Sequence, residues 1–181
     1  MFIQSDRIYL RALEPIDLEL LYQMENNISV WDVSNTITPF SRDILKLFLE
    51  TAHQDIFTNK QLRLMICQTN NHSVVGTIDL FEFDPHHLRI GVGILIIENF
   101  RKQGYAHEAI KLTLDYCFNT LLVNQVFCNI SNQNTESIKL FEDLKFKYAG
   151  NKKAWNRVGV NQYQDELIYQ CFNPKNQDLS L

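Results

Sequence analysis

The fold is decided by one stretch of the sequence, Arg89 to Ala109, which reads RIGVGILIIENFRKQGYAHEA. It opens with an apolar, β-branched run that is typical of a buried strand. A short polar turn follows, and from His107 to Leu121 apolar residues recur at helical spacing. The stretch therefore predicts a strand, a loop that carries Gly104, and a helix. In this order, the loop and the helix N-terminus present free backbone N–H groups to an anion such as a pyrophosphate.

The loop lacks the two best-known nucleotide-binding patterns. Neither Gly-x-Gly-x-x-Gly nor Gly-Lys-Ser/Thr occurs in it, so a Rossmann dinucleotide site and a kinase-type P-loop are not expected. An ordinary strand-to-helix turn, in which Gly104 serves only the backbone geometry, fits the same residues. The stretch alone leaves both interpretations open.

Length and composition narrow the remaining possibilities. The chain has 181 residues, of which 45% are hydrophobic and 21% charged, as in an ordinary globular domain with one core. A net charge of −4 gives no general attraction to nucleic acid or to an anionic membrane. The start of the chain has no basic segment followed by a long apolar one, and the apolar runs are too short for a membrane span. We therefore expect no signal peptide, no membrane association and no nucleic-acid partner.

The cysteines indicate the redox compartment. Four of them are widely spaced among apolar neighbours, at Cys67, Cys117, Cys128 and Cys171. No Cys-x-x-Cys pair occurs, so neither a zinc cage nor a redox motif is predicted, and no metal site is expected. We interpret the four as free, buried thiols of a cytoplasmic protein.

The rest of the chain alternates between strand and helix patterns. Besides the central strand, strands are predicted at 8–13, 61–68, 74–83, 125–130, 152–158 and 163–172. Helices are predicted after the turn at 14–17, from an N-cap at Ser41, from His107 and from Asn134. The pattern predicts a single domain over residues 1–172, a mixed sheet with helices on its faces. A polar C-terminal tail, 173–181, is expected to fray.

Two separated motifs, in this order, resemble the GNAT superfamily of acyl-CoA-dependent N-acetyltransferases. The first runs from Ile94 through Ala106 and is similar to that family's strand and Arg/Gln-x-x-Gly-x-Gly/Ala pyrophosphate loop. The second, Asn134 to Phe146, is similar to the family's second cofactor motif, Asn-x-x-Ser-Ile-x-Leu-Tyr-Glu-x-x-Gly-Phe. A looser likeness, over 7–17, 75–80 and 161–172, is to the branch that contains bacterial spermidine and ribosomal-protein N-acetyltransferases.

The resemblance implies a GNAT-like α/β (α+β) fold with a central mixed, mostly antiparallel sheet, splayed at the central strand. About six to seven strands and about four flanking helices are expected. It also implies acetyl-CoA as co-substrate. The residues expected to hold it are Ile94, Leu95, Ile96, Arg101, Lys102, Gln103, Gly104, Tyr105, Ala106, His107, Asn134 and Ser137.

Each group in this set has an implied role. Loop amides from Gln103 to His107 would bind the diphosphate. The strand backbone from Ile94 to Ile96 would pair with the pantetheine arm and polarise the thioester carbonyl. Asn134 would hydrogen-bond the pantetheine. Simpler interpretations stay open. The isoleucines can be core residues alone, Asn134 can simply cap its helix, and Arg101 can be a solvated charge.

The sequence departs from the family pattern at three positions. Phe141 stands where the family often has a tyrosine that protonates the leaving thiolate, and a phenyl ring has no proton to give. Water can serve instead, because a thiolate leaves with little help. Lys145 replaces a glycine and is expected to alter the turn. Gly91 stands where many bacterial spermidine enzymes carry a glutamate, and this departure counts against a polyamine acceptor. The catalytic residues stay unassigned.

A base or an acidic cluster is still needed for an ammonium acceptor. The weak catalytic candidates are Glu82 and Asp84 before the central strand and Tyr163 on the closing hairpin. Further candidates nearby or in the first helix-to-loop region are Asp79, His86, His87, Glu25 and Asp32. A solvated turn is the alternative for each.

The leading hypothesis is an N-acetyltransferase that moves acetyl from acetyl-CoA to a primary amine of a small molecule, most simply a polyamine or diamine such as spermidine. The amine would attack directly, with Cys128 buried and inert. One alternative is a protein N-terminal acetyltransferase of the ribosomal-protein type. Another, motivated by Phe141, is a catalytically silent acyl-CoA-binding module. A homo-oligomer is compatible with the sequence.

Overall fold

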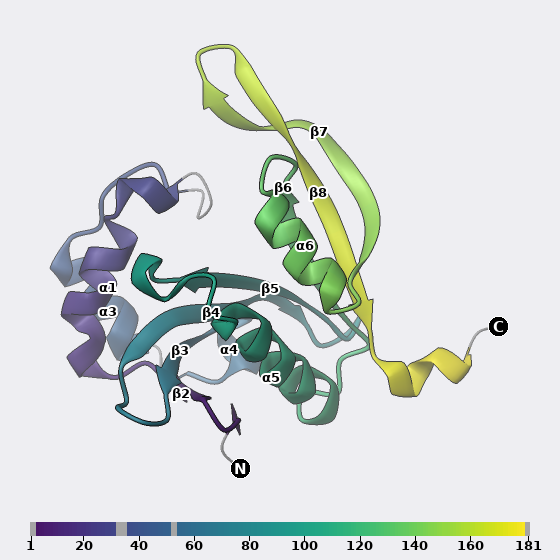
Figure 1. The fold of residues 1–181 in the computed structure, drawn as a ribbon, viewed down its shortest axis with the longest axis horizontal. Helices are drawn as coiled ribbons and strands as arrows, with labels where there is room; N and C mark the ends of the chain where they lie inside the picture. Colours follow the sequence, from purple (N-terminus) through teal and green to yellow (C-terminus); the bar gives the residue numbers. More distant parts are fainter. Residues whose placement is uncertain (1–2, 32–35, 52–53, 180–181) are drawn as a thin grey trace.

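The computed structural model describes residues 3–31, 36–51 and 54–179, and one mixed sheet of eight strands runs through them (Figure 1). The spatial order is β1-β2-β3-β4-β5-β6-β8-β7, and every neighbouring pair is antiparallel except β5 and β6. The strands are β1 Ile3–Gln4, β2 Ile8–Ala12, β3 Leu62–Gln68, β4 Val74–Asp84, β5 Arg89–Ile96, β6 Gln125–Ser131, β7 Lys147–Gly159 and β8 Gln162–Phe172.

The mixed, mostly antiparallel sheet is confirmed, and its strand number of six to seven is corrected to eight. The additional strand is β1, whose two residues pair with Tyr9 and Leu10 of β2. Two residues are too few to show an alternating pattern, so the sequence gives no signal for it.

Five α-helices lie within the described residues, namely α1 Leu18–Glu25, α3 Arg42–Thr51, α4 Ile56–Asn59, α5 Tyr105–Asn119 and α6 Thr135–Asp143. Short 3-10 turns are η1 Pro15–Asp17, η2 Ile28–Val30, η3 Glu98–Phe100 and η4 Pro174–Leu179. The predicted N-cap is confirmed, since Ser41 Oγ accepts the N–H of Ile44 at 3.2 Å. The single turn α4 was not predicted. Asp55 caps it by accepting the N–H groups of Phe57 and Thr58.

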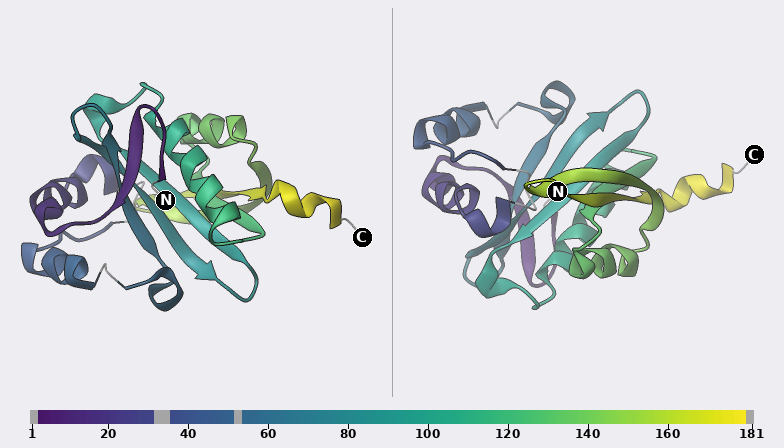
Figure 2. Two further views of the ribbon diagram at one scale, coloured as in Figure 1. Left: turned by 90° about the horizontal axis from the view of Figure 1, so that it is seen from below. Right: turned by 90° about the horizontal axis from the view of Figure 1, so that it is seen from above.

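The two faces of the sheet carry different layers, and Figure 2 gives the sheet from below and from above. Ile66, Ile78 and Val92 lie on one face, in the same buried cluster as Ala109 and Ile110 of α5 and Phe141 of α6. Alternation puts Arg63 and Asp79 on the other face, where Arg63 bonds Glu25 of α1. We call this second side the α1 face.

The sheet parts in its middle. β5 and β6 pair in parallel only from Arg89 to Gly91, against Gln125 to Phe127. Beyond these residues the strands separate, and in Figure 1 β6, β8 and β7 rise away from β5. This is the splayed central strand that the resemblance implies. We call this unpaired stretch between β5 and β6 the cleft.

The start of the C-terminal segment, at Asn173 and Lys175, is held to the end of α5. Asn173 is buried, and its Nδ2 donates to the carbonyls of Phe118 at 3.4 Å and Val123 at 3.2 Å. Lys175 Nζ reaches Asn119 Oδ1 at 2.6 Å. These polar side chains satisfy the end of α5. In the described chain we find no helix with the length and apolar content needed to cross a bilayer.

Candidate active site

The loop before α5 has the geometry of an anion site. Gly104 caps the helix in the left-handed region, with φ +86°, where a side chain would be strained. The first helical hydrogen bond runs from the Glu108 N–H to the Gly104 carbonyl at 3.2 Å. The amides of Tyr105, Ala106 and His107 precede it, so helical geometry gives them no acceptor inside the helix. Their N–H groups and the helix dipole together favour a bound anion.

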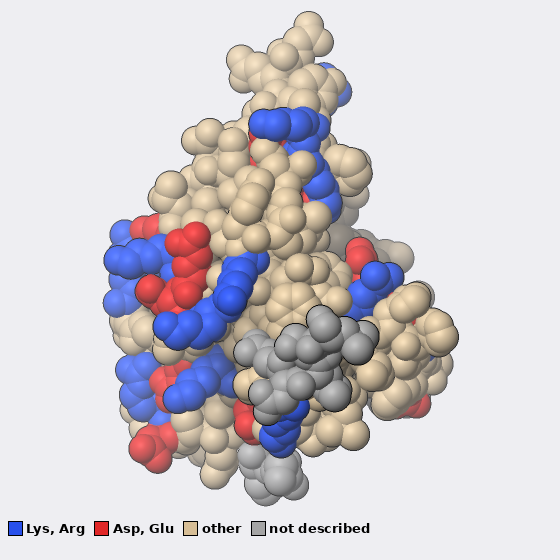
Figure 3. Space-filling model, turned by 90° about the vertical axis from the view of Figure 1, so that its right-hand side faces the viewer, with Lys and Arg blue, Asp and Glu red and all other residues tan. Residues whose placement is uncertain are grey.

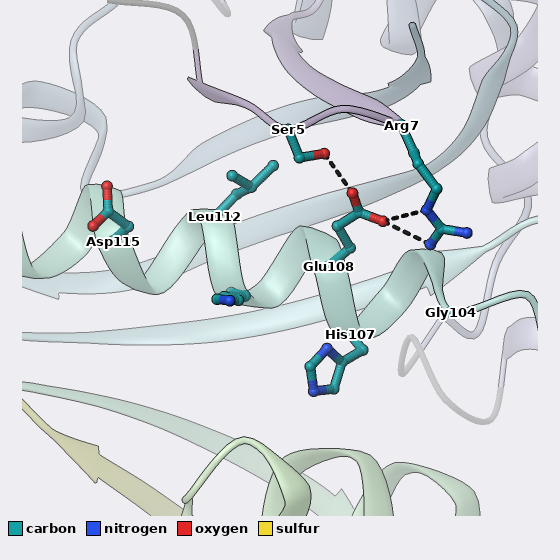
Figure 4. Close-up of a pocket in the computed structure, with 8 residues that line it drawn as sticks. Ser5, Arg7, Gly104, His107, Glu108, Leu112 and Asp115 are labelled. Carbon is teal, nitrogen blue, oxygen red and sulfur yellow. Dashed lines mark hydrogen bonds and ion pairs between the residues drawn. The ribbon is translucent and has the colours of Figure 1, made fainter. Parts of the chain in front are cut away.

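A side-chain lock holds this helix end against the first strands (Figure 4). Ser5 Oγ donates to Glu108 Oε1 at 2.5 Å, and Arg7 donates to Glu108 Oε2 from Nε at 2.9 Å and from Nη2 at 2.6 Å. Arg7 Nη1 also reaches the Gln103 carbonyl at 3.3 Å. Burial raises the pKa of Glu108, but the bonds from Ser5 and Arg7 outweigh it and hold that pKa below its usual value.

A shallow groove of about 620 Å³ runs along this lock and the outer side of α5. His107 also lines it, and Figure 4 shows His107 pointing away from Ser5 and Arg7. No local pattern in the sequence indicates that Ser5 and Glu108 are partners, because they meet only through the fold.

The backbone of β5 offers groups to the cleft at alternate residues. The Ile97 N–H bonds the Val75 carbonyl at 2.9 Å, so it points to β4. By alternation, the backbone groups of Ile94 and Ile96 point the other way, toward the parted β6, and those of Leu95 point to β4. Gly76 agrees with this assignment, since a Cβ there would lie 2.2 Å from the Leu95 carbonyl oxygen. Among the three predicted strand residues, Ile94 and Ile96 thus face the cleft with their backbone.

Arg101 has a definite contact. Its Nε donates to the Ile96 carbonyl at 3.1 Å, so the side chain folds back on the last residue of β5. It therefore connects the loop to the strand end, which neither of the sequence-based interpretations anticipated.

The second motif lies across the cleft from the first. Asn134 caps α6 through its Oδ1, which accepts the Ser137 N–H at 3.0 Å. Lys102 of the loop pairs with Glu136 in the first turn of α6, at 3.1 Å between Nζ and Oε1. The two motifs, far apart in the sequence, meet at the mouth of the parted sheet.

Phe141 and Lys145 show how the departures from the family pattern are accommodated. The Phe141 ring is buried and packs edge-on against Phe146, with centroids 4.9 Å apart, so it belongs to the core. Lys145 adopts φ +70°. The lysine thus adopts the left-handed geometry that suits glycine, at a cost of about 1 kcal/mol.

On the α1 face, Arg63 brings two sequence candidates together. Its Nε donates to Asp79 Oδ1 at 2.5 Å, and its Nη1 donates to Glu25 Oε1. Burial alone would lower the pKa of Arg63, but the two carboxylates outweigh it and raise that pKa. One guanidinium between two carboxylates leaves one surplus negative charge. Asp79 is opposite Gly93 of β5, just past the point where the sheet parts.

Arg63 itself was not singled out from the sequence, although a signal existed. It is a charged residue inside the otherwise apolar strand pattern LRLMICQ of β3. A charge in that position needs a counter-charge on the same face, and Asp79 on the neighbouring strand supplies it.

The three weak catalytic candidates do not come together in the described structure. Asp84 Oδ1 accepts the N–H groups of His86 at 3.0 Å and His87 at 2.9 Å, and these turn contacts hold its pKa below the usual value. Glu82 is exposed at the adjacent bulge. Both line a groove of about 710 Å³ on the α1 face. Tyr163 lies elsewhere, 55% exposed on the projecting β7–β8 hairpin. Asp32 lies outside the described residues.

The thiols are buried, as predicted. All four cysteines are free, and burial raises the pKa of Cys117 to about 12. Burial also raises the pKa of Cys128, which lies inside β6. Neither thiol is poised to form the thiolate that a covalent acetyl-enzyme would need.

A parted sheet with a free strand edge, beside a helix N-terminus whose amides favour an anion, fits an acyl-CoA-dependent acyltransferase. Comparison with known families agrees. The model of the acetyltransferase (GNAT) domain matches residues 7–147, and the chain belongs to this family. It is therefore an acetyl-CoA-dependent N-acetyltransferase, and acetyl-CoA is its acyl donor.

Several relatives share most of its length. An uncharacterised N-acetyltransferase, p20, of Bacillus licheniformis is 28% identical over 153 residues, covering 82% of this chain and 83% of that protein. The spermidine N(1)-acetyltransferase of Vibrio cholerae is 24% identical over 146 residues, covering 81% and 82%. A crystal structure of spermidine N-acetyltransferase from Vibrio cholerae, in complex with CoA and spermine, superposes with a TM-score of 0.85 at 22% identity, covering 94% and 98%. This last likeness establishes the fold.

Proposed function

We propose that the acceptor is a polyamine or a small diamine, acetylated on a primary amine by direct attack on the thioester. The observation that carries this proposal is the Glu25–Arg63–Asp79 group on the α1 face. Its surplus negative charge lies beside Gly93, on the opposite side of the sheet from α5. A cationic acceptor gains charge-assisted hydrogen bonds there. The spermidine acetyltransferases among the relatives support the same class.

The donor would lie in the cleft between the two motifs. In this arrangement the amides from Gln103 to His107 bind the diphosphate, and Lys102 and Arg101 line its approach. The backbone groups of Ile94 and Ile96 pair with the pantetheine arm and polarise the thioester carbonyl, while Leu95 contributes a side chain on the α1 face. Asn134 and Ser137, at the start of α6, lie at the opposite wall.

The chemistry needs three proton transfers. The amine nitrogen attacks the carbonyl carbon and loses a proton to solvent as the tetrahedral intermediate forms. The C–S bond then breaks to leave the amide, and CoA leaves as a thiolate that takes a proton from water. The nitrogen must lose its ammonium proton first, and Asp79 is the carboxylate nearest to the parting point in register. Phe141 contributes packing and no proton.

The test is release of CoA thiol with spermidine, spermine, putrescine, aminoglycosides and short peptides with free N-termini. We expect turnover with the polyamines. Asp79→Asn should raise the acceptor KM by about tenfold or more, because a charge-assisted hydrogen bond is lost, and should leave CoA affinity unchanged. Glu19→Gln is the matched control, since Glu19 also pairs with an arginine, Arg42, but on the exposed surface.

Other outcomes identify the alternatives. Turnover with peptides alone would favour a protein N-terminal acetyltransferase. CoA binding without turnover on any amine would favour the silent acyl-CoA-binding module. Phe141 motivates this alternative, because its buried ring has no proton to give.

We also propose that the enzyme works in the cytoplasm and forms a homo-oligomer. Four free, buried cysteines support the compartment. Exposed apolar side chains on the β7–β8 hairpin support self-association, among them Trp155 and Val160. Figure 3 shows the projecting end of the molecule at the top as mostly uncharged.

A further inference from the structure

Three residues on neighbouring strands form one row across the sheet at the parting point. Phe81 of β4 is opposite Gly91 of β5, and Gly91 is opposite Phe127 of β6. Gly91 and Phe127 are the last pair before β5 and β6 separate. The row therefore marks the closed end of the cleft.

Gly91, in the middle of this row, has no side chain, so the rings of Phe81 and Phe127 on either side of it can meet. A Cβ on Gly91 would lie 2.3 Å from the Phe81 ring, so that ring covers the glycine. The rings of Phe81 and Phe127 stand edge-to-face, with centroids 5.7 Å apart. Strands two apart in a sheet are separated by about 9.6 Å, so both side chains lean over Gly91.

This aromatic pair lies on the α1 face, the same side as Asp79. Asp79 and Phe81 are two residues apart on β4 and so point the same way. A Cβ on Gly93 would lie 3.8 Å from the Phe81 ring, so the ring borders the residue opposite Asp79. Both rings are only partly buried. Phe127 lines the groove of about 710 Å³, which Lys60, Arg89 and Lys152 also line, whereas Phe81 and Asp79 are outside its lining.

We propose that Phe81 and Phe127 form the floor of the acceptor site and select amines by the carbon chain beside the reacting nitrogen. The inference rests on the proposed function and adds a specificity determinant to it. Phenyl rings bury methylene groups favourably, and they offer no partner to a polar atom in the same position. In this chain the carboxylate charge lies to one side, at Asp79 and Glu25, while the floor itself is apolar.

The test compares two diamines of equal length and charge, 1,5-diaminopentane and its ether analogue 2,2′-oxybis(ethylamine). The wild-type enzyme should prefer the hydrocarbon in kcat/KM. Phe81→Ala should reduce this preference by about fourfold, the equivalent of one buried methylene, and Phe81→Leu should largely retain it.

Gly91→Ala supplies an independent arm. Its methyl group must displace the Phe81 ring, so the preference should fall as it does in Phe81→Ala. In a Phe81→Ala background the same change should have no further effect on the ratio. Tyr148→Ala is the control, since it removes an exposed ring from another edge-to-face pair, 5.9 Å from Tyr169. Thermal unfolding of each variant verifies that it is folded.

An unchanged preference in folded, active Phe81→Ala would overturn the inference and leave the proposed function intact. If the wild-type enzyme turns over neither diamine and none of spermidine, spermine and putrescine, the proposed function fails instead. The floor is then tested by calorimetric titration of the CoA-bound protein with both diamines. A preference for the hydrocarbon that Phe81→Ala removes would support the floor, and equal binding or no binding would overturn it.

Discussion

At the scale of single residues, the ion pair between Arg11 and Asp17 holds the start of α1, the helix that carries Glu25. Arg11 of β2 donates from Nη1 to Asp17 Oδ2 at 2.7 Å and from Nη2 to Oδ1 at 2.8 Å. Asp17 is only 4% exposed and also accepts the Glu14 N–H at 2.8 Å. The pair thus attaches the start of α1 to the sheet. Although burial raises the pKa of Asp17, its bonds to Arg11 and Glu14 outweigh burial and lower that pKa.

Asp17→Asn should therefore destabilise the protein by about 3 kcal/mol at neutral pH, because it leaves Arg11 without its buried counter-charge. A carboxylate whose pKa is lower in the folded state stabilises the fold above its unfolded pKa of about 3.9. This contribution is lost as the pH falls through the folded pKa. Urea unfolding should show a large difference between wild type and variant at pH 7 and a smaller one in acid. A difference independent of pH would contradict the assignment.

At the scale of elements, the N-terminus of α5 is positioned by contacts from β1 and β2. Ser5 and Arg7 hold Glu108 in the first turn of the helix, and Arg7 also bonds the Gln103 carbonyl in the loop. A diphosphate site made of backbone amides depends on such pre-organisation, because amides have no side chain with which to adapt.

Arg7→Ala should weaken CoA binding by about threefold to tenfold, because loosening the loop costs on the order of 1 kcal/mol on binding. The melting temperature should change little, since an exposed ion pair contributes at most about 1 kcal/mol. Isothermal titration with CoA measures the first effect. Arg42→Ala is the control, because Arg42 is as exposed as Arg7 and also pairs with a glutamate, Glu19, in a pair remote from α5. Equal affinity in both variants would show that the lock has no part in binding.

The elements that the sequence predicts well are those with a long, regular pattern. The central strand, α5 and α6 follow from apolar periodicity and from caps at Gly104 and Asn134. The single turn α4 and the two-residue β1 are too short to carry a period. The Glu25–Arg63–Asp79 group could not be derived as a unit, because its members come from three elements. The sequence shows that Gly91 and Gly93 lie in the central strand, but it does not show which residues of the neighbouring strands lie opposite them.

At the scale of the whole molecule, the four thiols lie in its interior. Cys67, Cys117, Cys128 and Cys171 are all buried, and burial raises the pKa of each. This distribution favours direct attack by the amine over a covalent acetyl-enzyme.

The native protein should therefore react only slowly with a thiol reagent at pH 7 to 8, and all four cysteines should react after denaturation. The reason is that the reagent needs an accessible thiolate. A colorimetric thiol titration, with and without urea, counts the reactive thiols in the folded and in the denatured protein. A single fast thiol in the folded protein would contradict the prediction and would point to an acetyl-enzyme route.

The parting of β5 from β6 also has a consequence for solubility. Past Gly91, β5 presents backbone donors and acceptors in the middle of the molecule, as an outermost strand does at the rim of a sheet. Such an edge can recruit an extended segment from another chain, which is the first step of β-aggregation. In the proposed binding mode, acetyl-CoA pairs with Ile94 and Ile96 and takes the place of that segment. We therefore expect the enzyme to aggregate more slowly with acetyl-CoA than without it.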